Sequence, residues 1–307
     1  MDISIITINY NSSAHTINMV ESIRTMSQSP ITYEIIIVDN ASKDEEYQQL
    51  SALESSPNTK IIRSRINGGF ASGNMLGVQY ASGKYYLFIN NDTLFQNDVL
   101  SYFHTYAQSH PDVGLLGGHL SNTDGSRTSS YKKFPSLTSN LLGNSLARFF
   151  TPNGFPSNKT ILEKPTQVGV ISGSCMFFRG DVFDSLGGFD TVFFLYCEEE
   201  DISKRVLDYG KQVIYLPEPS ILHLEGASTT RSLAIEKEFY ISYLHLLKKH
   251  FPLWKSTLLI GLRLFKEFRR SFRSPQSLYL FLFLLRGAPI KESLRYQQKI
   301  KGLQCLQ

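Results

Sequence analysis

Several polar side chains that could bind a ligand stand at the ends of short apolar runs. One run leads directly into Asn90, Asn91 and Asp92, another leads into Asp39, and a third leads into Tyr10. If these runs are strands of a parallel sheet, their carboxyl ends meet where open α/β sheets bind ligands. We therefore expect these side chains to surround one site.

The spacing of Asn90 and Asp92 suits a metal-assisted phosphate site. Residues two apart on an extended chain project to the same side, so both could face one ligand. A hard cation such as Mg²⁺ or Mn²⁺ takes one or two carboxylates and completes its shell with substrate phosphate. Taken alone, the Asn-Asp-Thr sequence favours an ordinary turn. Asp39 has two readings as well: it could hold a ribose or base, or it could cap a helix together with Ser42.

Four consecutive acids, from Glu198 to Asp201, open a predicted helix. The helix dipole tolerates acids in the first turn, which is a sufficient structural reason for them. Their mutual repulsion can also raise a pKa and prepare a general base. His223 lies beyond the next predicted strand. A lone histidine is usually structural, but this one could complete a metal shell with Asp92.

The stretch NGGFASGN (67–74) is a weak candidate for a phosphate loop. Gly68, Gly69 and Gly73 have neither P-loop nor GxGxxG spacing, and no Lys-Ser or Lys-Thr pair follows. These glycines could instead let the backbone approach a ligand closely.

Short apolar runs alternate with helical patterns, which predicts βαβ units and an α/β fold with a mostly parallel central sheet flanked by helices. We expect residues 221–229 to form a polar loop. The predicted strands are 3–10, 34–42, 60–64, 84–91, 113–120, 169–179 and 211–217, and the predicted helices are 12–26, 98–109, 181–190 and 198–210. A glycine-rich turn at 67–77 is predicted to open into a further helix that continues through Ala81.

Charge divides the chain into a body and a tail. The net charge is +4, yet residues 240–307 hold 13 Lys or Arg against 2 Asp or Glu. We predict a domain at 1–239 and a basic amphipathic helical tail at 240–307. The first part of the tail, including Tyr240 and Leu244, should pack on the body.

Further along the tail, apolar and basic side chains occupy different faces of one helix. The pattern is typical of binding to a membrane surface, although the helix could instead cover the domain. We expect a membrane surface, not a nucleic acid, as the anionic partner. The apolar face holds Leu258, Leu262, Phe265, Phe268 and Phe272, and the basic face holds Arg263, Lys266, Arg270 and Arg273.

The remaining bulk features indicate a reducing compartment. Three scattered cysteines do not form a disulfide framework, and the N-terminus resembles no signal peptide. The longest apolar run, Leu278–Leu285, is far short of the ~20 residues of a spanning helix. We expect a cytoplasmic protein, peripheral on the inner face of a bacterial membrane.

Seven motifs in order carry a specific resemblance over residues 1–230: SIITINYNS, IIIVDNAS, NGGFASGN, FINNDT, GSCMFFRGDVFDSLGGFD, FFLYCEEEDISKRV and ILHLEGAST. Together they closely resemble bacterial family 2 glycosyltransferases, most of all the rhamnosyltransferase type. The resemblance implies a GT-A fold and inverting, divalent-metal-dependent sugar transfer. The donor would be a nucleotide-diphospho-sugar linked to dTDP or UDP, with L-rhamnose as the candidate sugar. The acceptor would be a glycan or a lipid-linked molecule of cell-surface polysaccharide synthesis.

The resemblance also assigns roles to the strand-end residues. Asn90-Asn91-Asp92 falls on the family's Asp-x-Asp position, so Asp92 would hold the metal and Asn90 would contact ribose or metal more weakly. Asp190 would lie near the transferred sugar. By the same resemblance, the base and ribose would be bound by Asp39, Tyr10, Gly68 and Gly69.

In the acidic run, Glu199 takes the place of the catalytic base, which is usually an aspartate in the family. Glu198 and Asp201 would be supporting acids. His223 falls on the family's His-x-x-Gly-x-Ser histidine, a contact for the metal or the diphosphate.

Two other functions are consistent with parts of the pattern. A GT-A-like protein that binds a nucleotide-sugar or a partner without turnover would explain Asn90 and Glu199, where the family pattern has aspartate. A nucleotidyltransferase would also place metal on a strand-end acid, but it needs a Gly-rich, basic loop after the first strand, and NYNSSAH contains none.

Overall fold

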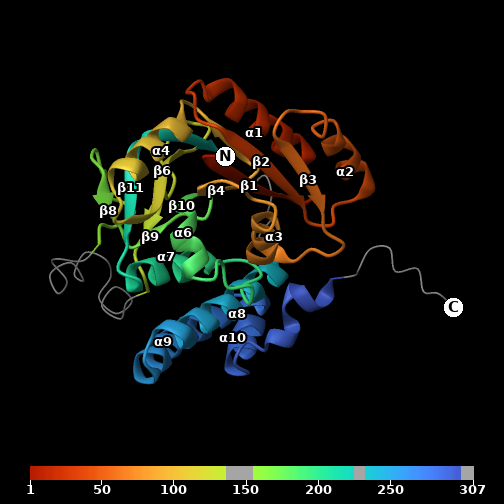
Figure 1. The fold of residues 1–307 in the computed structure, drawn as a ribbon. Helices are drawn as coiled ribbons and strands as arrows, with labels where there is room; N and C mark the ends of the chain where they lie inside the picture. Colours follow the sequence, from red (N-terminus) through yellow and green to blue (C-terminus); the bar gives the residue numbers. More distant parts are fainter. Residues whose placement is uncertain (136–154, 225–231, 299–307) are drawn as a thin grey trace.

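The computed structural model describes residues 1–135, 155–224 and 232–298. The first third of the chain alternates strands with helices (Figure 1). Strands β1 to β4 pair in parallel in the order β3-β2-β1-β4. The elements are β1 (Ile3–Asn9), α1 (Ser13–Met26), β2 (Tyr33–Asp39), α2 (Asp44–Ser51), β3 (Thr59–Arg63), α3 (Gly69–Val78) and β4 (Tyr85–Ile89).

The next part extends the same sheet with strands of both directions. The order continues β4-β10-β6-β11-β5, with β10 antiparallel to both neighbours and β6 parallel to β11. Strand β8 pairs with β11, and β7 with β9 forms a separate small sheet. The elements are β5 (Thr93–Phe95), α4 (Val99–Ser109), β6 (Val113–Ser121), β7 (Tyr131–Lys132), β8 (Thr166–Gln167), β9 (Val170–Ile171), β10 (Cys175–Arg179), α6 (Gly180–Ser185), α7 (Glu198–Asp208) and β11 (Gln212–His223).

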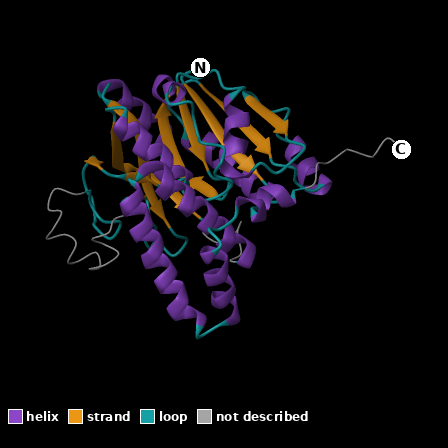
Figure 2. Ribbon diagram, turned by 90° about the horizontal axis from the view of Figure 1, so that it is seen from below, coloured by secondary structure: helices purple, strands orange, loops and turns teal. Residues whose placement is uncertain are grey.

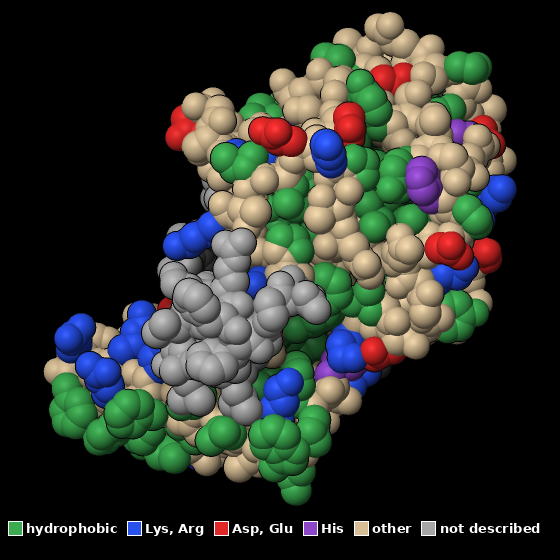
Figure 3. Space-filling view, turned by 90° about the vertical axis from the view of Figure 1, so that its left-hand side faces the viewer, with side chains coloured by type: hydrophobic (Ala, Val, Ile, Leu, Met, Phe, Trp, Pro, Cys, Tyr) green, Lys and Arg blue, Asp and Glu red, His purple; other side chains and the backbone are tan. Residues whose placement is uncertain are grey.

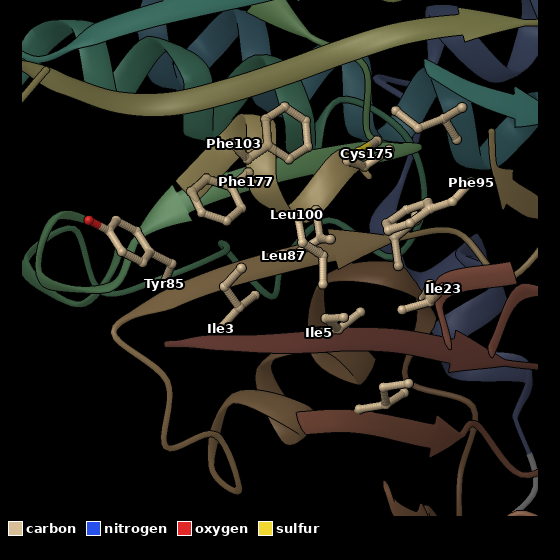
Figure 4. Packing of buried hydrophobic residues seen from close by; sticks show 14 of the residues in the cluster. Ile3, Ile5, Ile23, Tyr85, Leu87, Phe95, Leu100, Phe103, Cys175 and Phe177 are labelled. Carbon is tan, nitrogen blue, oxygen red and sulfur yellow. The ribbon is translucent and has the colours of Figure 1, made fainter. Parts of the chain in front are cut away.

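Helices cover both faces of the large sheet, so its central strands are apolar on both sides. Leu87 and Phe177 face the core beneath α1 and α4, shown in Figure 4. The next residue of each strand, Phe88 or Phe178, faces a second core on the side of α3, α6 and α7. This alternation is the period-two geometry of extended chain.

The C-terminal helices lie below the sheet in Figure 1 and reach away from it in Figure 2. Helix α8 packs on the body through Leu246, which contacts Phe193 and Cys197. Phe283 of α10 is fully buried against α8. The elements are α8 (Leu233–His250), α9 (Leu253–Ser271), α10 (Pro275–Leu285), η1 (Ile290–Glu292) and η2 (Leu294–Gln297). In the described parts of the chain, no helix combines the length and apolarity needed to cross a membrane.

The predicted α/β fold class is confirmed, with helices on both sides of the sheet and at the C-terminus. The strand expected at 169–179 is two strands separated by a turn, and α2 and β5 were not predicted. The polar loop expected at 221–229 is wrong at its start. Residues 221–223 continue β11, because they pair with β5 on one side and β6 on the other. The boundary expected after residue 239 falls inside α8.

One side chain of the predicted basic face is directed inward. Arg263 stacks over the rings of Phe239, Tyr240 and Tyr243, at 5.4, 5.2 and 5.9 Å from their centroids. The predicted apolar face of the same helix is correspondingly turned to solvent, since Phe265, Phe268 and Phe272 are exposed. The faces of the aromatic rings of α8 attract the Arg263 guanidinium, and this attraction accounts for its inward direction.

Candidate active site

A cleft of about 390 Å³ lies at the carboxyl ends of β1, β2 and β4. One wall is polar and consists of residues that directly follow these strands. The opposite wall is mostly apolar and comes from the segment before α7 and from the C-terminal elements. The polar residues include Tyr10, Ser12, Asn40, Asn90, Asn91 and Asp92, and the apolar residues include Phe70, Phe194, Leu195, Ile235 and Leu294.

Asp92 and His223 meet at this edge, as predicted. His223 is the last residue of β11, and its pairing with Thr93 of β5 brings its Nε2 to 3.3 Å from Asp92 Oδ1. The backbone N–H of Leu224 donates to the Asp92 carbonyl at 2.8 Å, which fixes the turn. Because β11 runs longer than the sequence pattern predicted, the histidine reaches Asp92, which lines the cleft.

The two side chains fit part of a divalent-metal shell. They offer a carboxylate oxygen and an imidazole nitrogen at one rim of a cleft with room for a phosphate ligand. Among the residues that the structure describes, no group of three or more His, Cys, Asp or Glu side chains could hold a metal ion.

Asn91 lines the cleft, but its amide holds the start of α1. Its Nδ2 donates to Ser12 Oγ at 2.7 Å and to Thr16 Oγ1 at 2.9 Å. Asn90 is attached to β10, because its backbone N–H donates to the Ser174 carbonyl at 3.0 Å. The structure thus gives Asn91 a positioning contact with α1, while Asn90 and Asp92 line the same cleft.

Asp39 is fully buried and does not line the cleft. Its carboxylate accepts hydrogen bonds from Asn9 Nδ2 at 3.0 Å and from the Ser42 backbone N–H at 3.3 Å, and Arg63 Nε lies 3.6 Å away. These contacts hold the turn after β2, and Asp39 does not cap helix α2, whose N-cap residue is Lys43. They do not match direct contact with a base or ribose in this conformation.

At the end of β2, the residue that lines the cleft is Asn40 and not its neighbour Asp39. Its Nδ2 donates to the Gly69 carbonyl at 3.0 Å, and its Oδ1 accepts from the Gly68 N–H at 3.3 Å. The side chain therefore fixes the glycine turn against the end of β2. Its place directly after a strand was the available signal.

Gly69 lies on the cleft and must be glycine, whereas Gly68 is set back from it. Gly69 has a φ of +76°, and a Cβ there would lie 2.1 Å from the Phe194 carbonyl oxygen. The Phe70 N–H donates to that same oxygen at 2.8 Å. The glycine turn therefore joins the two walls of the cleft.

Asp190 is directed at helix α8, away from the cleft-lining residues. Lys249 Nζ lies 2.6 Å and His245 Nε2 3.3 Å from its Oδ2. Burial acts to raise the pKa of Asp190, but the hydrogen bond from Lys249 outweighs it and lowers the pKa overall. In this conformation Asp190 fixes the loop before α7 and does not line the cleft.

Helix α7 begins next to the cleft. A Cβ at Gly173 would lie 3.8 Å from Glu199 Cβ and 3.9 Å from Cζ of the cleft residue Phe70. The adjoining Ser174 holds Asn90. Glu199 is therefore close to the turn that holds the Asn90–Asp92 stretch, although Glu199 does not itself line the cleft.

Lys132, which the sequence analysis missed, neutralises part of the acidic run. Its Nζ lies 2.6 Å from Glu199 Oε1 and 2.8 Å from Glu200 Oε1. The lysine comes from the two-residue strand β7, far away in sequence. No periodicity or motif singles it out.

The three glutamates differ in protonation because their surroundings differ. Burial, reinforced by the charge of Glu199, raises the pKa of Glu198 well above its usual range. The same two causes raise the pKa of Glu200 to about 7. For Glu199, burial also acts to raise the pKa, but the Lys132 charge and hydrogen bond outweigh it and lower the pKa. Glu199 is therefore the one of the three whose carboxylate form is favoured by its surroundings, and this is the form that a general base requires.

The backbone before the acidic helix is strained. Tyr196 and Cys197 both have positive φ, 71° and 67°. Such conformations cost of order 1–3 kcal/mol each and persist where packing enforces them, often at functional sites. Cys197 is buried beneath α8, and its carbonyl accepts from the Asp201 N–H at 3.0 Å.

Asp201 is a structural acid in this conformation. Its fully buried carboxylate lies 2.7 Å from Arg205 Nη2, Lys249 Nζ and His250 Nε2 alike. Burial acts to raise the pKa of Asp201, but the hydrogen bond from His250 and the charges of Arg205 and Lys249 lower it to about 2. Asp201 thereby connects α7 to the C-terminal end of α8.

Comparison with known proteins gives the chain its family. The family model described as Glycosyl transferase family 2 matches residues 4–187. The chain belongs to this family. It is a family 2 glycosyltransferase with a rhamnosyltransferase-like sequence. It is 24% identical over 278 residues to the N-acetylglucosaminyl-diphospho-decaprenol L-rhamnosyltransferase of Mycobacterium tuberculosis. This alignment covers 84% of this chain and 88% of the relative.

Solved structures share the fold of this glycosyltransferase. The S. aureus TarS structure, residues 1–349, aligns with a TM-score of 0.56 at 14% identity, over 85% of this chain and 69% of TarS. GalNAc-T7, solved with UDP, GalNAc and Mn²⁺, aligns with a TM-score of 0.59 at 15% identity, over 81% of this chain and 48% of that one. At such identities the likeness extends to the fold alone.

The raised pKa of Glu200 predicts a pH-dependent stability. A carboxyl whose folded pKa exceeds its unfolded value favours the fold at low pH, and this contribution is lost as pH rises through the folded pKa. Glu200→Gln should therefore lose less Tm than the wild type between about pH 5 and pH 8, measured by scanning fluorimetry. The exposed Glu163→Gln serves as the matched control. Equal losses of Tm in all three proteins would contradict the assignment.

Asp201 predicts a large stability effect. Asp201→Ala leaves Arg205, Lys249 and His250 without the buried carboxylate that they share, so it should lower the free energy of unfolding by about 3–5 kcal/mol in urea at neutral pH. Asp208→Ala is the control within the same helix, because its carboxylate is 56% exposed and pairs only with Lys204. That change should cost at most about 1 kcal/mol. Similar costs for the two variants would show that the buried network is not structural.

Proposed function

We propose that this glycosyltransferase is an inverting enzyme that moves a sugar from a nucleotide-diphosphate donor to a glycan or lipid-linked acceptor in cell-surface polysaccharide synthesis. The observation that carries the proposal is the ionised Glu199 beside the Asn90–Asp92 stretch of one cleft. The relatives named as an L-rhamnosyltransferase and as an O-antigen biosynthesis protein support this class of product. We place the enzyme in the cytoplasm, at the inner face of the membrane.

For the donor, we propose dTDP-L-rhamnose first and UDP-sugars second. The rhamnosyltransferases among the relatives favour L-rhamnose. TarS has been solved with UDP-GlcNAc, which favours the second class. In the cleft, Tyr10 and the Asn40-held glycine turn would contact the nucleoside.

Asp92 and His223 would hold Mg²⁺ or Mn²⁺ together with the donor diphosphate. A bound divalent ion supplies Lewis-acid stabilisation of the charge that develops on a leaving diphosphate. The GalNAc-T7 structure with Mn²⁺ supports a metal of this kind in the fold.

Glu199 would act as the general base. Its carboxylate accepts the proton of the acceptor hydroxyl while that oxygen forms its bond to the anomeric carbon. The bond from this carbon to the diphosphate breaks on the opposite face, the diphosphate leaves with the electron pair, and the configuration inverts.

The contacts of Glu199 suit this step. Oε1 is held by Lys132, whereas Oε2 has no hydrogen-bond partner among the described residues, as is also true of Oε2 in Glu198 and Glu200. Of the three carboxyls, Glu199 has the lowered pKa. Lys132 thus orients the base and favours its ionised form.

Glu199→Gln should abolish turnover while donor binding persists. The amide preserves the shape of the side chain but cannot accept the proton, and a positioned base contributes about 10²–10⁴-fold to rate. The measurements are kcat for transfer and the nucleotide-sugar Kd. Glu198→Gln and Glu200→Gln are the matched variants, and wild-type kcat in Glu199→Gln would assign the base to one of these neighbours.

Asp92→Ala should remove the metal-dependent part of donor binding. Nucleotide-sugars screened with and without Mn²⁺ should raise the Tm of the wild type, because a ligand of the native state stabilises by RT ln(1 + [L]/Kd). The exposed Asp124→Ala is the control. Unchanged metal-dependent stabilisation in Asp92→Ala would exclude Asp92 as a ligand. Donor binding without hydrolysis or transfer would instead favour the non-catalytic binding protein.

A further inference from the structure

Helices α9 and α10 expose large apolar side chains that no described part of the chain covers. They form a hairpin that projects from the body and turns at 272–274 (Figure 2). Trp254, Phe265 and Phe272 are 66%, 60% and 75% exposed. On α10, Leu278, Leu282 and Leu285 are exposed at helical spacing. We call residues 253–286 the hairpin.

This exposure is not a sign of a poorly packed hairpin. Its inner side is well buried, with Leu259, Leu280 and Phe283 against α8 or its neighbours. Arg263 stacks on the rings of α8, as described above. The hairpin therefore has a fixed inner face and a separate outer apolar face, and patches of this kind mark interaction sites.

The charges of the hairpin have one sign on its outer surface. It contains seven Lys or Arg residues and one acid, Glu267. Glu267 is fully buried and pairs with Arg270 at 3.2 Å. Lys266, Arg269 and Arg273 are exposed beside the apolar residues. Figure 3 shows hydrophobic side chains along the lower edge of the molecule with Lys and Arg above them.

We propose that the outer face of the hairpin binds the surface of an anionic lipid bilayer, with its apolar side chains at the headgroup boundary and its cations against the lipid phosphates. Apolar groups flanked by Lys and Arg are the pattern of helices that lie in a membrane interface. Anionic lipids attract such basic segments. A second copy of this chain fits less well, because two hairpins face to face would oppose cations with cations and expose no acid between them.

The hairpin is also continuous with the cleft. It is inserted between α8 and η2, and both contribute cleft residues, Ile235 before the hairpin and Leu294 after it. Glu238 of α8 accepts from Ser293 Oγ at 3.0 Å and from the Leu294 N–H at 2.8 Å, which closes the base of the hairpin. A bound hairpin would hold this wall of the cleft at the bilayer. Its use in delivering a lipid-linked acceptor rests on the proposed function.

Vesicle sedimentation tests the proposal with the purified full chain. The probes are vesicles of phosphatidylcholine alone and of phosphatidylcholine with phosphatidylglycerol in equal parts. We expect partitioning onto the anionic vesicles to be at least about tenfold stronger, and to weaken as added salt screens the charges. No binding to the anionic vesicles would overturn the proposal.

Two sets of substitutions separate the apolar and charged contributions. Phe265→Ser with Phe272→Ser should lower partitioning by about tenfold or more on both vesicle types, because apolar burial drives insertion. Lys266→Gln, Arg269→Gln and Arg273→Gln together should remove most of the difference between the two vesicle types. All five side chains are exposed, so the fold should be retained.

Matched controls lie on the body. Ile161 and Tyr209 are 67% and 52% exposed, and Ile161→Ser with Tyr209→Ser should leave partitioning unchanged. Equal loss in hairpin and control variants would overturn the proposal. So would a hairpin-dependent dimer in ultracentrifugation that does not bind vesicles.

The donor screen separates this proposal from the proposed function. Donor stabilisation without vesicle binding overturns the role of the hairpin alone. Vesicle binding without stabilisation by any nucleotide-sugar overturns the proposed function but still supports membrane binding by the hairpin.

Discussion

The structure depends on compensating four consecutive acids that begin one largely buried helix. Two sets of cations do this from opposite sides. Lys132 reaches Glu199 and Glu200 from the small sheet, while Arg205, with two residues of α8, surrounds Asp201. Desolvated carboxylates without such partners would protonate or disrupt the fold. Since the compensation is uneven along the run, neighbouring glutamates acquire different pKa values, and one stays ionised.

The same compensation explains why the C-terminal helices belong to the catalytic unit. Helix α8 supplies cations to the acidic helix, covers the strained backbone at Cys197 and places Ile235 on the cleft. A tail that only tethered the enzyme would need none of these contacts. The site is therefore assembled from both ends of the chain, with the sheet supplying its polar wall and the C-terminal elements much of its apolar wall.

The sequence was sufficient for features set by local pattern. Strands that end in polar residues predicted the edge where Asp92 lies, because the switch from apolar to polar residues marks a strand end. Contacts between distant segments could not be read in this way. Asp39 turns inward because Asn9 and Arg63 bond it, and Lys132 reaches Glu199 across 67 residues of sequence. The side of α9 that faces solvent likewise depends on the packing of Arg263 against the aromatic rings of α8.

Lys249 has a particular consequence for the order in which the protein is made. Its single ammonium group lies 2.6 Å from Asp190 and 2.7 Å from Asp201, so one late residue joins both ends of the segment that carries the strained turn. A ribosome that has released the whole sheet has not yet released this lysine. The sheet is thus complete in sequence before the residue that clamps its acidic loop.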